Sequence, residues 1–161
     1  MGRLGAMDVL RQPAGPARRD VLLLGAGSMA GVCAEAADRL ADHGIGVTVV
    51  DPRWVKPLDP ALAGAARQYG LVATAEDNGR VGGFGDAVAR LLRDHDIDTP
   101  VRTFGLEQRF LEHGERGNLL DAQGLTPQHL ARQITELVAR LTPELAVTGE
   151  GHRAADEDQP A

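Results

Sequence analysis

The pattern of apolar and polar positions predicts strands that alternate with helices. Residues 21–24, 47–50 and 71–75 are continuous apolar or β-branched runs of the kind found in strands buried on both faces of a parallel sheet. Between these runs, apolar residues recur at helical spacing in residues 29–40 and 62–69. Strand, helix and strand joined by short links predict right-handed βαβ units.

The rest of the pattern completes one domain. We expect a third helix from Phe84, a fourth strand at residues 101–104 and a final amphipathic helix at residues 126–141. Residues 7–11 are predicted to form a short edge strand that lies antiparallel beside the strand at residues 21–24. The predicted fold is a three-layer α/β domain with a mostly parallel sheet and helices on both faces.

We place this domain at residues 20–141. Residues 1–19 form a leading segment that contains the possible edge strand and a turn at residues 13–16. From residue 142 to residue 161 the composition turns to glycine, acidic residues and proline without periodicity, which predicts a disordered acidic tail.

Composition narrows the classes of function. The 161 residues are 43% hydrophobic, which fits one globular domain, and only 3% aromatic, which predicts an aliphatic core. A net charge of -6 argues against nucleic acid as a partner. No apolar run reaches the roughly 18 residues of a membrane span, and the N-terminus shows no secretory signal. Cys33 is the single cysteine and lies on an apolar helix stripe, which predicts a buried, unreactive thiol in a reducing cytoplasm.

One motif suggests a nucleotide. Residues 25–30 read Gly-Ala-Gly-Ser-Met-Ala, which matches a dinucleotide-binding fingerprint between a strand and a helix, and Asp51 follows where a ribose-binding acid is expected. Against this interpretation, Pro52 begins a stiff, bulky loop, and the chain is short for a second, substrate-binding domain. The alternative is that Gly25 and Gly27 let the first helix pack closely on the sheet.

A second glycine-rich stretch follows the third predicted strand. Four glycines, at positions 79, 82, 83 and 85, lie between that strand and the next helix. Glu76 and Asp77 are expected to end the strand, at the sheet edge where ligands bind in α/β proteins. They either order a loop at an interface with another domain or are solvated carboxylates that begin a turn. The glycines allow close approach of backbone, from within the domain or from a partner.

Three segments together resemble one family. Residues 47–59 read VTVVDPRWVKPLD, residues 76–85 read EDNGRVGGFG, and residues 105–114 read GLEQRFLEHG. In this order and spacing they resemble the C-terminal domain of 1-deoxy-D-xylulose-5-phosphate synthase, a thiamine-diphosphate enzyme of the transketolase superfamily. The resemblance covers about residues 2–141. Glu107 stands where this family usually has proline, so the loop before Phe110 is expected to be less rigid.

The resemblance implies a domain that works with others. In that family two preceding domains bind thiamine diphosphate and magnesium and hold the acid–base residues, and the enzyme serves isoprenoid-precursor and thiamine synthesis. No catalytic residue carries over to this sequence, which lacks the diphosphate and metal motif. The resemblance therefore implies a chain that binds no cofactor and is inactive alone. The alternatives are the nucleotide-binding domain described above and a non-catalytic interaction module of the same fold. Its implied partners are the thiamine-diphosphate-binding domains or subunit of the same enzyme, in a homo- or hetero-oligomer.

The residues that we expect at the interface with those partners lie in the three segments. They are Arg53, Trp54, Lys56, Glu76, Asp77, Gly82, Gly83, Gly85, Phe110 and His113. Arginine and tryptophan are common interface anchors, although Trp54 is equally suited to cap the aliphatic core. The glycine loop is expected to be a docking surface.

The histidines suggest no metal site. His43, His95, His129 and His152 share neither metal-ligand spacing nor a helix face. His113 stands beside Glu112, and we expect it to pack within its loop rather than to act in acid–base chemistry.

Overall fold

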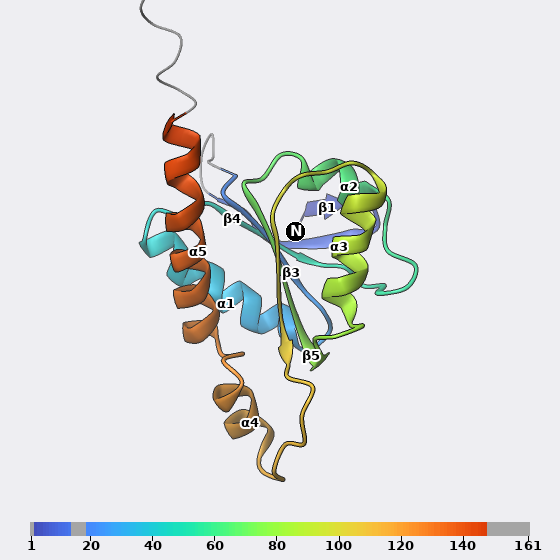
Figure 1. The fold of residues 1–161 in the computed structure, drawn as a ribbon, viewed down its shortest axis with the longest axis vertical. Helices are drawn as coiled ribbons and strands as arrows, with labels where there is room; N and C mark the ends of the chain where they lie inside the picture. Colours follow the sequence, from blue (N-terminus) through green and yellow to red (C-terminus); the bar gives the residue numbers. More distant parts are fainter. Residues whose placement is uncertain (1, 14–18, 148–161) are drawn as a thin grey trace, which may run out of the picture.

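A six-stranded sheet forms the middle layer of the structure (Figure 1). The computed structural model describes residues 2–13 and 19–147. The strands are, in spatial order, β1 (Gly2–Leu4), β2 (Met7–Arg11), β4 (Val47–Asp51), β3 (Val21–Gly25), β5 (Leu71–Gly79) and β6 (Val101–Leu106). Strands β4, β3, β5 and β6 are parallel, whereas β1 and β2 form an antiparallel hairpin. The mostly parallel sheet predicted from the sequence is confirmed.

The position of the N-terminal hairpin differs from the prediction. Strand β2 pairs antiparallel with β4, with Asp8 opposite Asp51, and β1 rather than β2 is the edge strand. The physical reason is that β4 and β5 already occupy both sides of β3, so β3 has no free edge. Beside β4, the side chains of Met7 and Val9 become almost fully buried.

Helices cover both faces of the sheet. Helices α1 (Met29–Asp42) and α5 (Pro127–Val147) cover one face. Helices α2 (Ala61–Ala66) and α3 (Phe84–Asp94) cover the other. The short α4 (Arg116–Ala122) follows β6 and lies beyond the end of that strand (Figure 1). The three-layer arrangement therefore matches the predicted fold class.

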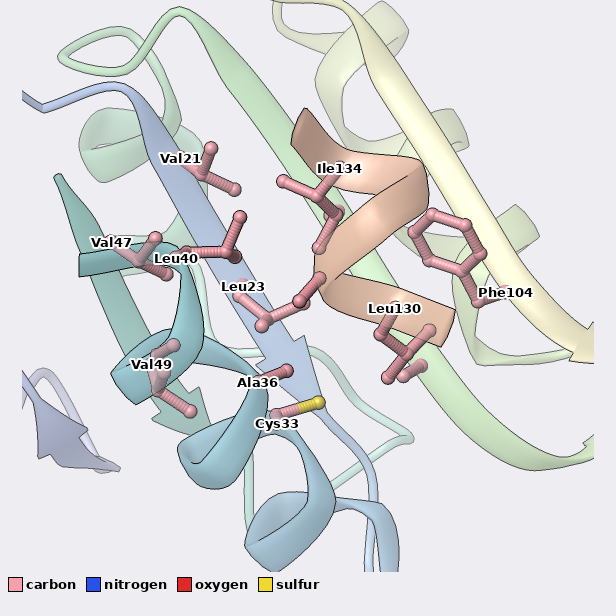
Figure 2. Packing of buried hydrophobic residues seen from close by; sticks show 14 of the residues in the cluster. Val21, Leu23, Cys33, Ala36, Leu40, Val47, Val49, Phe104, Leu130 and Ile134 are labelled. Carbon is pink, nitrogen blue, oxygen red and sulfur yellow. The ribbon is translucent and has the colours of Figure 1, made fainter. Parts of the chain in front are cut away.

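The core is aliphatic and has two halves, one on each face of the sheet. Successive residues of a strand point to opposite faces and so belong to different halves. Leu23 contributes to the cluster beneath α1 and α5, and its neighbour Leu22 to the cluster beneath α2 and α3. Figure 2 shows Cys33 and Leu40 of α1 beside Leu23, with Ile134 of α5 completing the same layer. Burial raises the pKa of the Cys33 thiol to about 12, so the side chain acts as a small apolar group.

Two predicted boundaries change. Strand β5 runs on to Gly79 instead of ending at residue 75, and α5 continues to Val147 instead of ending at residue 141. The predicted tail is therefore helical at residues 142–147, and its remaining residues, 148–161, lie outside the described part of the chain. Most of the predicted turn at residues 13–16 also lies outside it. Within the described residues, no helix is both long and apolar enough to span a membrane.

Candidate functional site

The candidate site is the edge of the sheet at which the parallel strands end, which we call the carboxyl edge. The loops after β3, β4, β5 and β6 all leave the sheet here because these strands are parallel. The large apolar side chains that the described residues leave exposed lie in three of these loops. They are Trp54 (67% exposed), Val55 (46%), Val81 (63%) and Phe110 (105%). Large apolar side chains left exposed along one edge are candidates for contact with another protein.

The loop after β4 is held in a fixed shape that turns Trp54 outward. Asp51 Oδ1 accepts the backbone N–H of Arg53 at 2.9 Å, and the Arg53 side chain donates to Asp8 Oδ2 at 2.5 Å. Arg53 has a φ of 59°, a left-handed conformation that suits a tight turn. Because Trp54 is largely exposed, it does not cap the aliphatic core, and that alternative is wrong.

A cavity of about 370 Å³ lies beneath Trp54. Its apolar walls are Ala6, Pro52, Trp54, Pro57, Leu58 and Pro60. The carboxylate of Asp59 also lines it and accepts the N–H groups of Ala6 at 2.6 Å and Ala61 at 2.8 Å. These bonds, first that from Ala6 and then that from Ala61, lower the pKa of Asp59. Asp59 thus ties the turn of the N-terminal hairpin to the start of α2, and the pocket wall is fixed on both sides. We call this cavity the Trp54 pocket.

Glu76 organises the glycine loop from below. Its carboxylate is 1% exposed and accepts the first N–H groups of α3, from Phe84 at 2.8 Å and from Gly85 at 2.9 Å. A negative charge at a helix N-terminus is favourable because the unpaired N–H groups there carry partial positive charge. Of the two interpretations of Glu76, the solvated carboxylate that begins a turn is wrong, because β5 continues to Gly79 and Glu76 is buried within it.

The two glycines next to this carboxylate are required by packing within the domain. A Cβ atom at Gly83 would lie 2.5 Å from Glu76 Oε1 and 2.6 Å from the carbonyl oxygen of Gly79. A Cβ atom at Gly85 would lie 2.5 Å from Thr103 Cγ2. Gly82, by contrast, has a φ of +72° and open space around it. Glu76, Gly83 and Gly85 therefore support the loop from inside, and contact of Gly82 with a partner stays a prediction.

The side chain of Arg116, which sequence reasoning missed, links three parts of the carboxyl edge. Arg116 of α4 donates to Asp77 Oδ2 from Nη2 at 2.5 Å and from Nε at 2.8 Å, and to Ser28 Oγ at 2.9 Å. Asp77 belongs to β5, and Ser28 precedes α1. Arg116 is 39 residues from Asp77 in the chain, and no spacing in the sequence signals this pair. Its effect is to hold the segment between β6 and α4 against the sheet.

That segment carries the most exposed aromatic side chain. Phe110 is fully exposed, and His113 is exposed as well, so its packing within the loop stays a prediction. Glu107, which stands where the family usually has proline, forms an ion pair with Arg109 at 2.7 Å. The structure thus brings Phe110, His113 and Asp77 to the same edge of the sheet as Trp54 and Lys56, and exposes all of them at least partly.

The fingerprint at residues 25–30 has a packing explanation. A Cβ atom at Gly25 would lie 2.7 Å from Ala30 Cα, so glycine is needed for α1 to begin so close to the strand. Gly27 has a φ of +57°, which also favours glycine. Asp51 is bonded to the backbone of Arg53. Nucleotide binding by Gly25, Gly27 and Asp51 stays a prediction that no contact in the structure requires.

The described residues do not offer a ligand set for magnesium. Over residues 2–13 and 19–147, no three His, Cys, Asp or Glu side chains come together in a way that could hold a metal ion.

Comparison with known proteins identifies the fold family. Residues 14–130 match the family model described as transketolase, C-terminal domain. The chain belongs to this family. It is 63% identical over 139 residues to 1-deoxy-D-xylulose-5-phosphate synthase of Thermobifida fusca, covering 86% of this chain and 22% of that protein. It is 57% identical over 143 residues to the synthase of Frankia casuarinae, covering 88% and 22%. The resemblance inferred from the three segments is confirmed.

Solved structures agree with the family. A chain described as split gene transketolase, inactive beta4 tetramer, superposes with a TM-score of 0.73 at 32% identity, over 86% of this chain and 44% of that one. Transketolase of Campylobacter jejuni superposes with a TM-score of 0.57 at 18% identity, over 83% of this chain and 19% of that one, which shows the fold alone. The chain spans only about a fifth (22%) of the length of the two synthases that it matches.

Proposed function

We propose that this transketolase C-terminal domain serves a 1-deoxy-D-xylulose-5-phosphate synthase-type transferase by assembling with its catalytic part, and that it catalyses nothing alone. The observation that carries the proposal is the 63% identity over 139 residues to a synthase of which the chain matches only 22%. The substrates would then be pyruvate and glyceraldehyde 3-phosphate, and the pathway isoprenoid-precursor and thiamine synthesis, in the cytoplasm.

The carboxyl edge supports an assembly role. Trp54 and Phe110 are large aromatic side chains that the fold exposes instead of burying, and aromatic residues of this kind often dominate binding energies at interfaces. Arg53, Lys56, Asp77, Gly82 and His113 lie around them in the same loops. In this proposal these residues face the partner, and Glu76, Gly83 and Gly85 hold the glycine loop in shape beneath them.

The partner in this proposal is the part of the enzyme that binds thiamine diphosphate and magnesium. Thiamine diphosphate supplies a carbanion-stabilising centre when it is bound. This chain's contribution is structural: Arg116 fixes the segment that bears Phe110, and Asp59 fixes the Trp54 pocket. Both devices keep partner-facing residues in place before binding, which lowers the entropic cost of assembly.

Without that partner we infer that the chain assembles with itself. The solved relative at 32% identity is described as an inactive tetramer of its β subunit. Without its partner, the apolar side chains of the carboxyl edge stay in water. Self-association of the chain would bury them, and this burial is favourable.

A chimera tests the proposal. The region of the Thermobifida fusca synthase that matches this chain is replaced by this chain, and formation of 1-deoxy-D-xylulose 5-phosphate is measured. The controls are the same synthase truncated before that region, and this chain alone with thiamine diphosphate and magnesium. We expect an active chimera, an inactive truncation and an inactive lone chain. Turnover by the lone chain, or a folded chimera without activity, would overturn the proposal.

A further inference from the structure

The carboxyl edge carries both a hollow and a projection. The hollow is the Trp54 pocket, with its volume of about 370 Å³ and mainly apolar walls that also include Asp59. The projection is the segment between β6 and α4, which carries Phe110 with its ring fully in solvent. In Figure 1 the loop after β4 lies on the right and the segment that leads to α4 hangs at the bottom. The two features therefore lie on different parts of one molecule and do not contact each other.

Phe110 has the chemistry that the pocket accepts. A phenylalanine side chain buries roughly 150–250 Å² when it leaves water, which makes it a strong anchor for an apolar hollow. The pocket presents the indole of Trp54 and the rings of Pro52, Pro57 and Pro60. Offset or edge-to-face contact between Phe110 and Trp54 adds to this burial.

Each feature has an exposed charged side chain beside it, and these two side chains are of opposite sign. Around the pocket, Asp8 pairs with both Arg53 and Arg3, and the Asp59 carboxylate in the wall is held by two backbone N–H groups. The exposed Lys56 lies beside them. Around Phe110, Arg109 pairs with Glu107, and Glu112 and Glu115 are both exposed. Within the described residues neither Lys56 nor Glu112 forms an ion pair. Opposite charges beside an anchor and its pocket steer the two together and fix their orientation.

We propose that a second copy of this chain occupies the Trp54 pocket, with Phe110 of one copy inserted beneath Trp54 of the other and Glu112 beside Lys56. This inference rests on the self-association in the proposed function and names the surface that carries it. Two such contacts, exchanged between two copies, close the assembly, whereas a single unreciprocated contact would propagate into a chain of copies. Both halves are fixed in advance, the projection by the Arg116–Asp77 pair and the pocket by Asp59.

Sedimentation velocity on the 161-residue chain over a range of concentrations tests the contact. We expect reversible self-association by the unaltered chain, and Phe110→Ala or Trp54→Ala to raise its dissociation constant by at least about 30-fold, as for an interface hot spot. Circular dichroism checks that both variants fold, as expected for such exposed side chains. A chain that stays monomeric, or two variants that associate as the unaltered chain does, would overturn the proposal.

Reversing the charges of Lys56 and Glu112 distinguishes this specific contact from non-specific association. Lys56→Glu and Glu112→Lys should each weaken association about 5-fold to 10-fold, and the double variant should recover most of the loss, because the pair is restored with its signs reversed. Glu35→Lys, an equal charge change on the exposed face of α1, is the matched control and should have no such effect. Failure of the double variant to recover would sink the pairing of Lys56 with Glu112.

A disulfide trap reports the contact directly. Chains with Lys56→Cys are mixed with chains carrying Glu112→Cys, with oxidised glutathione as the oxidant. We expect a linked dimer from the mixture and little from either variant alone, since Cys33 is buried and unreactive. Absence of the mixed dimer would contradict the contact while leaving the chimera experiment, and so the role in the synthase, untouched. An inactive chimera together with a mixed dimer would contradict the role in the synthase and support the contact between copies.

Discussion

The carboxylate of Glu76 lies at the start of α3, where its Oε1 accepts the N–H of Gly85 at 2.9 Å. Its other oxygen accepts the N–H of Phe84, and no cation is needed to hold this buried charge. The carboxylate of Glu76 in β5 thus holds the N-terminus of α3, and the glycine loop joins these two elements. Its shape is set inside the domain, before any partner is present.

Replacement of Glu76 should therefore destabilise the isolated domain. Glu76→Ala leaves two buried N–H groups of α3 without their acceptor, and hydrogen bonds to charged groups are worth about 1.5–3 kcal/mol each. We expect the free energy of unfolding in urea to fall by about 2–4 kcal/mol. Glu35→Ala, on the exposed face of α1, is the control and should change the free energy by less than about 0.5 kcal/mol.

Gly83→Ala should also destabilise the isolated domain. The added methyl group would press against Glu76 and the Gly79 carbonyl, and overpacking of this kind typically costs about 1–3 kcal/mol. The matched control is Gly64→Ala in α2, where nothing lies within 4 Å and alanine should stabilise the helix by about 0.5–1 kcal/mol. If Gly83→Ala left the stability of the domain unchanged and weakened only its assembly, the loop would be a docking surface as the sequence suggested.

The Arg116 link should control the motion of the segment that bears Phe110. Asp77→Asn removes the charge that Arg116 binds, and for a partly exposed ion pair the global stability should change by less than about 1 kcal/mol. Hydrogen exchange of residues 107–122 should nevertheless become faster, because α4 loses its attachment to β5. Asp94→Asn, which breaks an exposed pair with Arg90 on α3, should leave the exchange of this segment as it was.

Asp59 should make the attachment of the N-terminal hairpin sensitive to acid. Its bonds to Ala6 and Ala61 lower its pKa, so they stabilise the fold above the ordinary carboxyl pKa of about 3.9 and are lost as the pH falls through the lowered value. Asp59→Asn keeps an acceptor oxygen but does not titrate. Urea unfolding from pH 7 to pH 2 should show the advantage of the unaltered chain over this variant shrinking in acid. A constant difference would contradict the role of the charge.

Much of the fold could be predicted from the sequence because its signals are local. The runs at residues 21–24 and 47–50 are buried on both faces, as continuous apolar strands should be, and the three-layer arrangement follows from them. The partner of β2 could not be predicted in this way. It depends on which strand keeps a free edge in the assembled sheet, and that is β4 rather than β3.

The candidate site was predicted only in part, because some of its features depend on local sequence and others on tertiary contacts. Its segments and Phe110 follow from motifs that are continuous in the chain. For Glu76 the sequence leaves two interpretations, a solvated strand end or a residue that orders an interface loop. Only the fold shows that the N–H groups of α3 replace the water around its carboxylate. The pair of Arg116 and Asp77 joins elements far apart in sequence, so only tertiary structure brings it together.

The central claim, a domain that assembles but does not catalyse, is tested most directly by titration. This chain is added in trans to the Thermobifida fusca synthase truncated before the matching region, and activity is followed against the concentration of the chain. With the unaltered chain, activity should rise from none to a plateau. With Trp54→Ala the half-saturating concentration should rise by about 10-fold or more while the plateau stays the same, since the tryptophan contributes only to binding. A lower plateau at unchanged half-saturation, or activity from the chain alone, would contradict the account.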